Sequence, residues 1–174
     1  SIGSRAFYGA AIQTLDIPNS VTTLGTYAFS NCKKLETLTV GNGITKIGDY
    51  AFNSCTMLSQ IACPSVTEIG ASAFKGCSAL KSLPLSDRIV TLGASAFSGC
   101  TGITELTVPN SITSIGSYAF EKCTALTSAT LGTGIAAVPD YAFSGCTALE
   151  SVVLPANITA IGKYCLLYTS DAAD

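Results

Sequence analysis

The chain has 174 residues, of which 48% are hydrophobic and 11% are charged, a composition that excludes an intrinsically disordered chain and predicts a compact fold. Apart from Lys33-Lys34 and Glu121-Lys122, the nine basic and eleven acidic residues are scattered singly, so no basic face exists and nucleic acid is not expected as a partner. Apolar runs stay short of the roughly 20 residues that cross a bilayer, and we expect no membrane insertion.

Phenylalanine recurs along the chain at steps of 22 or 23 residues, and cysteine follows it three residues later in most units. The phenylalanines are Phe7, Phe29, Phe52, Phe74, Phe97, Phe120 and Phe143. The cysteines are Cys32, Cys55, Cys77, Cys100, Cys123 and Cys146, with Ala10 in the first position. This periodicity predicts a repeat protein, and we call each repeat a unit.

Each unit contains the same series of short elements. Segments such as Leu38-Thr39-Val40, Leu83-Pro84-Leu85 and Leu106-Thr107-Val108 alternate and therefore predict a half-buried strand. Pro or Gly marks the turn that follows. A second alternating segment, such as Ile112 to Ile115, predicts a shorter second strand. The remaining Tyr-Ala-Phe-x-x-Cys piece is too short for an isolated helix and predicts one helical or 3-10 turn.

A single unit cannot bury its apolar stripe alone, so the units are expected to stack about 4.8 Å apart. Stacking places about seven short strands in one parallel sheet. It also places the Phe, Leu, Ile and Cys residues of successive units in continuous columns, which form the predicted core.

The cysteines are predicted to be structural. Six of them share one repeat position, none form a Cys-x-x-Cys pair, and a straight column cannot surround a metal tetrahedrally. Cys63 occupies the core position of its strand. We therefore expect buried free thiols, no metal and no cofactor. The chain has no histidine, so we also expect no enzyme activity.

The outward positions of the strands are the candidate binding site, because stacking joins them into one surface. The site residues are Thr37, Thr39, Gln60, Ser82, Glu105, Thr107, Ser128, Thr130 and Ser151. This hydroxyl-rich face suits an extended protein segment or a glycan, although Thr and Ser are also typical of solvated strands. A column of Tyr27, Tyr50, Tyr118 and Tyr141 is interpreted as packing between neighbours, with exposed binding anchors as the alternative.

The pattern Leu-x-x-Leu-x-Val-Pro-x-Ser-Ile-Thr-x-Ile-Gly-x-Tyr-Ala-Phe-x-x-Cys is clearest between Ile103 and Cys123. It resembles the BspA-like leucine-rich repeats, also called the Treponema pallidum type, and the match covers residues 2–164. The resemblance implies a leucine-rich-repeat solenoid, a β-rich α/β horseshoe. Its parallel sheet of about seven short strands lies on the concave side, with second strands and helical or 3-10 turns on the other side. It also implies a cell-surface or secreted location, a role in adhesion and no catalytic residues.

Residues 1–164 are interpreted as repeats truncated at both ends, because Ser1 to Phe7 align with the middle of a later unit. Residues 165–174 resemble a translated sequencing adapter and are predicted to be a non-native tail. Units without polar caps are expected to self-associate. Two functions stay open. The chain is either a protein-interaction or adhesion module of a larger cell-surface protein, binding a protein or glycan through the concave face, or a repetitive spacer without a ligand.

Overall fold

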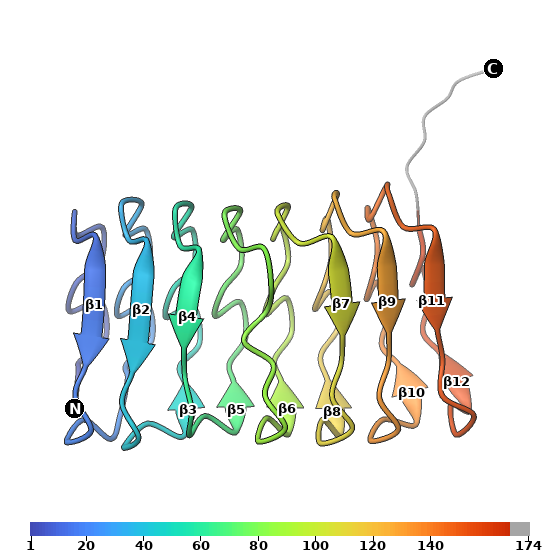
Figure 1. The fold of residues 1–174 in the computed structure, drawn as a ribbon, viewed down its shortest axis with the longest axis horizontal. Coiled ribbons are helices and arrows are strands. Elements are labelled where there is room, and N and C mark those ends of the chain that lie inside the picture. Colours follow the sequence, from blue (N-terminus) through green and yellow to red (C-terminus); the bar gives the residue numbers. More distant parts are fainter. Residues whose placement is uncertain (168–174) are drawn as a thin grey trace.

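A computed structural model describes residues 1–167 and shows a solenoid of stacked units (Figure 1). One strand per unit lies on the side that we call the strand side. These strands are β1 (Thr14–Ile17), β2 (Thr37–Val40), β4 (Gln60–Ala62), β7 (Glu105–Thr107), β9 (Ser128–Thr130) and β11 (Ser151–Val153). All of their pairings are parallel, and the register sets Thr37 beside both Thr14 and Gln60. The predicted leucine-rich-repeat solenoid is therefore confirmed.

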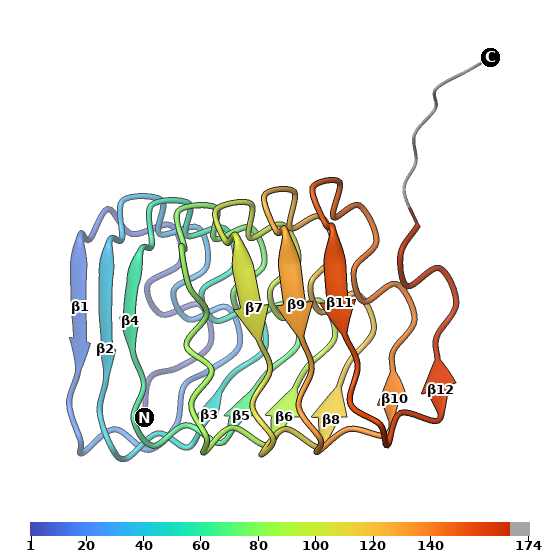
Figure 2. The same cartoon turned by 45° about the vertical axis from the view of Figure 1, so that its right-hand side comes forward.

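Two-residue strands form along a second edge of the units (Figure 2). They are β3 (Lys46–Ile47), β5 (Glu68–Ile69), β6 (Thr91–Leu92), β8 (Ser114–Ile115), β10 (Ala137–Val138) and β12 (Ala160–Ile161). The first four pair in the order β3-β5-β6-β8, and β10 pairs with β12. This second sheet stops between β8 and β10 because Pro139 replaces the glycine whose N–H otherwise donates to the preceding unit, as Gly116 N–H does to Leu92 O at 2.9 Å.

The sheet on the strand side is also interrupted, which corrects the expected single sheet of about seven strands. It consists of two three-stranded sheets, β1-β2-β4 and β7-β9-β11, and Ser82, Leu83 and Pro84 between them form no strand (Figure 1). Pro84 has no N–H to donate to the ladder. The N–H of Leu85 bonds to Leu83 O in its own unit at 2.8 Å, whereas Val108 N–H reaches Thr130 O of the next unit at 2.9 Å.

The Tyr-Ala-Phe-x-x-Cys segments form successive turns, and none of the described residues is helical. Bonds such as Ala28 N–H to Gly25 O at 3.1 Å and Cys32 N–H to Phe29 O at 3.3 Å close these turns. The expected helical or 3-10 turn does not form because two positions in each of these segments adopt a left-handed backbone, with φ of 58° at Tyr27 and 60° at Asn31. We call the surface made by these segments the turn side.

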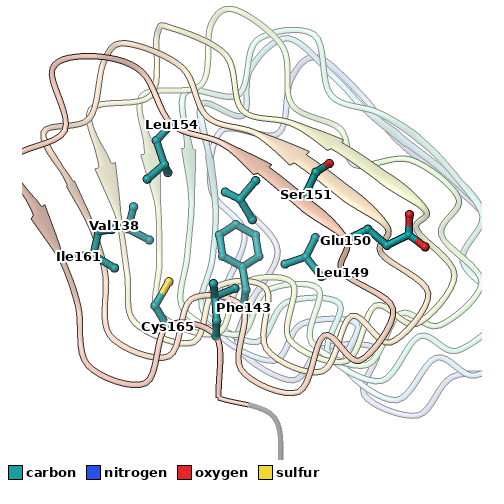
Figure 3. A pocket seen from close by; sticks show the side chains of 10 residues that line it. Val138, Phe143, Leu149, Glu150, Ser151, Leu154, Ile161 and Cys165 are labelled. Carbon is teal, nitrogen blue, oxygen red and sulfur yellow. The ribbon is translucent and has the colours of Figure 1, made fainter.

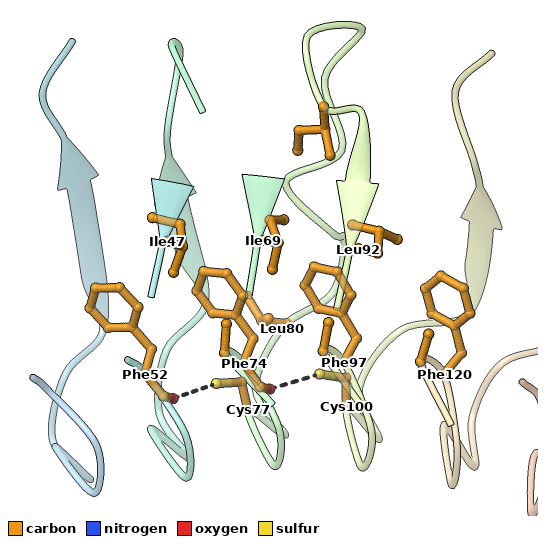
Figure 4. Close-up of a cluster of buried hydrophobic side chains, with 14 of the residues drawn as sticks. Ile47, Phe52, Ile69, Phe74, Cys77, Leu80, Leu92, Phe97, Cys100 and Phe120 are labelled. Atoms are coloured by element: carbon orange, nitrogen blue, oxygen red, sulfur yellow. Dashed lines mark hydrogen bonds between the residues drawn. The ribbon is translucent and has the colours of Figure 1, made fainter. Parts of the chain in front are cut away.

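The core is a continuous set of columns between these sides (Figure 4). Phe7 and the phenylalanines after it form an uninterrupted stack, with neighbouring ring centroids from 5.0 Å for Phe7 and Phe29 to 6.2 Å for Phe97 and Phe120. The rings from Phe29 to Phe143 are buried, and each contributes burial free energy of about 1.5–3 kcal/mol. The stack therefore accounts for the strict repetition of Phe.

The cysteine thiols connect neighbouring units. The Cys77 thiol donates a hydrogen bond to Phe52 O at 3.2 Å, and the Cys100 thiol donates to Phe74 O at 3.3 Å (Figure 4). The same bond recurs from Cys32 through Cys146. Each repeated cysteine therefore both fills space and satisfies a main-chain carbonyl of the unit before it, a role that the sequence analysis did not foresee.

Candidate binding surface

The predicted site residues lie on the strand side, and all nine reach solvent. Thr39, Gln60, Ser82, Glu105, Thr107, Thr130 and Ser151 are exposed, and Thr37 and Ser128 are half-buried. Alternate residues of each strand point inward, as Leu38 and Leu106 do, which leaves the polar residues outside. The predicted outward orientation is thus confirmed, and the binding role stays a prediction.

The strand register divides these residues into two patches. The first patch holds Thr37, Thr39 and Gln60 on β2 and β4. In the second patch, Glu105, Ser128 and Ser151 form one row across β7, β9 and β11, and Thr107 lies beside Thr130 in another. Ser82 belongs to neither sheet, because the interruption at Pro84 removes its strand. The surface is therefore not the continuous face that the sequence predicts.

A shallow apolar hollow accompanies this interruption. Ile61, Cys63, Leu83 and Leu85 line it together with Pro84, and the Cys63 thiol lies 3.9 Å from Pro84 O. Sequence analysis missed this feature, although a proline inside a strand pattern is a recognised signal of an interrupted or edge strand. The hollow separates the two polar patches.

Few charged residues lie on the strand side. Its carboxylates are Asp16 in β1 and Glu105 in β7, which lie in different sheets. No group of three or more His, Cys, Asp or Glu residues within residues 1–167 is placed to hold a metal ion. The polar groups on this side are therefore mainly hydroxyl, amide and main-chain groups, and not a charged cluster.

The cysteines have the chemistry of structural groups. Burial raises the pKa of the Cys55 and Cys100 thiols to about 12 and raises that of Cys63 to about 11. Because the thiolate is the reactive form, these side chains stay protonated and inert near neutral pH. All eight cysteines are buried and free of disulfides.

The tyrosine column packs on the turn side, as interpreted from the sequence. Tyr27 and Tyr50 stack with ring centroids 4.5 Å apart, and Tyr118 and Tyr141 stack at the same distance. Tyr164 continues the second stack at 5.1 Å from Tyr141. Two serines, Ser72 and Ser95, occupy the positions between the stacks.

An apolar pocket of about 360 Å³ lies at the last described unit (Figure 3). Phe143, Leu149 and Cys165 line it, and Ile161 beside them is 61% exposed. Cys165 O accepts the Phe143 N–H at 2.9 Å, and Leu167 O accepts the Gly145 N–H at 2.9 Å, so residues 165–167 continue the bonding of the turns. Residues 168–174 of the predicted non-native tail lie outside the described residues.

Stacked parallel strands, a buried column of Phe and Leu and a unit of 22 or 23 residues define a leucine-rich-repeat protein. The sequence profile of the BspA type leucine rich repeat region, in 6 copies, matches residues 1–101 and 67–172. The chain belongs to this family. No match was found among curated proteins. Within residues 1–167, no helix has the length and apolar character needed to span a membrane.

Solved bacterial structures share the fold. A leucine rich repeat protein of Treponema pallidum is 29% identical with a TM-score of 0.62, and the match covers 92% of this chain and 65% of that one. A leucine rich cell surface protein of Faecalibacterium prausnitzii is 31% identical with a TM-score of 0.68, covering 87% and 50%. A leucine-rich repeat protein of Bacteroides ovatus is 30% identical with a TM-score of 0.70, covering 88% and 48%. The chain thus spans about half to two thirds of the length of these proteins.

Proposed function

We propose that this chain is the protein-interaction or adhesion module of a larger cell-surface or secreted protein, and that it binds its ligand through the strand side. The observation that carries the proposal is that the recurring and the variable residues of each unit lie on different sides of its strand. The recurring Phe, Cys and Leu residues are buried, whereas the outward strand residues vary from unit to unit and lie in register within each of the two sheets on the strand side. The name of the Faecalibacterium prausnitzii protein supports the location.

The second patch offers the more specific arrangement of polar groups. Glu105, Ser128 and Ser151 supply one carboxylate and two hydroxyls in a row, with Thr107 and Thr130 beside them. Such a row offers acceptors and donors at the spacing of paired strands, about 4.8 Å, which suits an extended protein segment that crosses the strands. We expect this ligand to be a protein segment or a glycan, and no nucleic acid, cofactor or metal.

A binding assay with matched variants tests the proposal. The chain is offered to an array of immobilised extracellular proteins and glycans, and Thr107→Arg is compared with Thr113→Arg, a change at another exposed threonine, which lies beside β8 of the second sheet. We expect Thr107→Arg to abolish a signal that Thr113→Arg retains, with unchanged circular dichroism for both. Absence of any ligand, or equal binding by both variants, favours the alternative function of a spacer.

We further propose that this chain of 174 residues self-associates through its last unit. Ile161 is 61% exposed and Leu166 is 48% exposed beside the apolar pocket, a concentration of apolar surface that favours association. Ile161→Lys is expected to shift sedimentation velocity profiles toward the monomer. Val90→Lys, at an exposed valine in an interior unit, is the matched control and should leave them unchanged.

A further inference from the structure

The turn side contains a column in which two aromatic rings are missing. It is formed by the residue two positions before each phenylalanine, and the same left-handed backbone recurs there, with φ of 57° at Tyr50, 52° at Ser72 and 55° at Ser95. Tyr27 stacks on one face of Tyr50, and the next position along the solenoid is Ser72. The ring stack therefore ends at Tyr50 and resumes at Tyr118, three units further along the solenoid.

The same two units also lack side chains at a second position. Gly76 and Gly99 stand where the neighbouring units carry Ser54 and Lys122, and their φ values of +74° and +72° belong to the left-handed region that glycine adopts without strain. A hollow of about 480 Å³ lies over Gly76 and Gly99 and extends to Tyr27 and Tyr50, and this volume is within the size range of small-ligand sites. We call it the turn-side hollow.

One end of the turn-side hollow is aromatic and the other is polar. Tyr50 and Asn53 lie at the first end. At the other end, the buried Ser98 hydroxyl donates to Glu121 Oε2 at 3.0 Å and so holds this carboxylate in place. Lys122 Nζ lies 3.8 Å from Glu121 Oε1, and Lys75 adds a second exposed ammonium group. Donors and acceptors thus surround a site with one aromatic wall.

We propose that the turn-side hollow binds a linear oligosaccharide of gluco-configured pyranoses. Such a ring has equatorial hydroxyls, so its flat C–H face can pack on Tyr50 while its edge hydroxyls meet Asn53, Glu121 and the lysines. An axial hydroxyl would block one face of the sugar, whereas a gluco-configured ring can pack on Tyr50 through either face. A partner's aromatic side chain would use the Tyr50 face but would bring at most one hydroxyl, which is too few for both the carboxylate and the ammonium groups.

The site is independent of the strand-side proposal, and the chain itself supplies the substitutions that test it. Tyr50→Ser introduces the residue that Ser72 and Ser95 already show to be compatible with this backbone. Ser72→Tyr introduces the missing ring, which would stack on the face of Tyr50 that the sugar uses. Tyr141→Ser makes the same change in the same column outside the hollow and is the matched control.

Saturation-transfer NMR and isothermal titration calorimetry with cellotetraose and with tri-N-acetylchitotriose measure the binding. We expect binding to the unmodified chain, affinity at least about tenfold weaker for Tyr50→Ser and Ser72→Tyr, and unchanged affinity for Tyr141→Ser. Thr107→Arg should leave sugar binding intact. The proposal is overturned if neither sugar binds, if Tyr50→Ser and Ser72→Tyr bind as the unmodified chain does, or if the aromatic probe p-cresol binds while both sugars do not.

Discussion

The strand side and the turn side of the solenoid differ at the unit that contains Pro84. On the strand side, Pro84 interrupts the sheet and leaves β4 and β7 unconnected. On the turn side, the unit-to-unit bonds continue without a break, as from Phe52 N–H to Ala73 O at 2.8 Å and from Phe74 N–H to Ala96 O at 2.9 Å. The turn side, with its Phe stack and Cys bonds, and the second sheet β3-β5-β6-β8 therefore hold successive units together where the pairing on the strand side is absent.

The largest expected effect comes from breaking the Phe stack. Phe74→Ala removes a fully buried ring between Phe52 and Phe97 and is expected to lower the free energy of unfolding by about 3–5 kcal/mol. Phe7→Ala, at the same repeat position but with a ring 46% exposed, should cost much less. Urea denaturation followed by circular dichroism measures both. Equal losses would contradict a stability that resides in the buried stack.

The next effect comes from the cysteine bonds. Cys77→Ala removes a buried thiol and its hydrogen bond to Phe52 O, and we expect a loss of about 1–2 kcal/mol in the free energy of unfolding. In Cys63→Ala, on the strand side, the lost contact is the longer one of 3.9 Å to Pro84 O. Its loss in the same urea titration should be smaller. A larger loss for Cys63→Ala would show that the strand side dominates.

Thiol labelling compares the two sides without mutation. Cys63 and Cys165 are each 8% exposed, whereas Cys55, Cys77 and Cys100 are fully buried. Burial raises the pKa of all five thiols, so access of the reagent sets the expected difference in labelling rate. Iodoacetamide at pH 8 is expected to modify Cys63 and Cys165 at least about tenfold faster than the other cysteines, as measured by peptide mass spectrometry. Uniform labelling of all eight cysteines would mean that the solenoid opens as one body.

The smallest expected effect comes from repairing the strand side. Pro84→Thr restores an N–H that can join the two sheets, which gains about 0.5–1.5 kcal/mol. Replacing proline also increases the conformational entropy of the unfolded chain, which offsets about 0.4–1 kcal/mol of this gain. We expect the free energy of unfolding to rise by a net value of about 0.5 kcal/mol. Amide hydrogen exchange at Leu85 and in β7 should also become slower. Unchanged exchange at these amides would show that Pro84 is not what separates the sheets.

The repeat pattern was sufficient to predict the solenoid, the buried columns and the outward orientation of the site residues. Side chains at a fixed period of 22 or 23 residues can be buried only against their equivalents in adjacent units. The family resemblance added the leucine-rich-repeat class. The apolar alternation of Leu83-Pro84-Leu85 nevertheless predicts a strand, although Pro84 has no N–H to donate to a neighbouring strand.

The sequence by itself therefore determined the unit, the stacking and the identity of the core residues, because the same apolar positions recur in every repeat and can be buried only by stacking. Only the tertiary structure decided where the stacking changes from unit to unit. The bond from the Cys77 thiol to Phe52 O joins groups 25 residues apart. The turn-side hollow brings together Tyr50, Gly76, Gly99 and Glu121, which belong to four successive units. Such features depend on the distance between neighbouring units, and no single repeat encodes that distance.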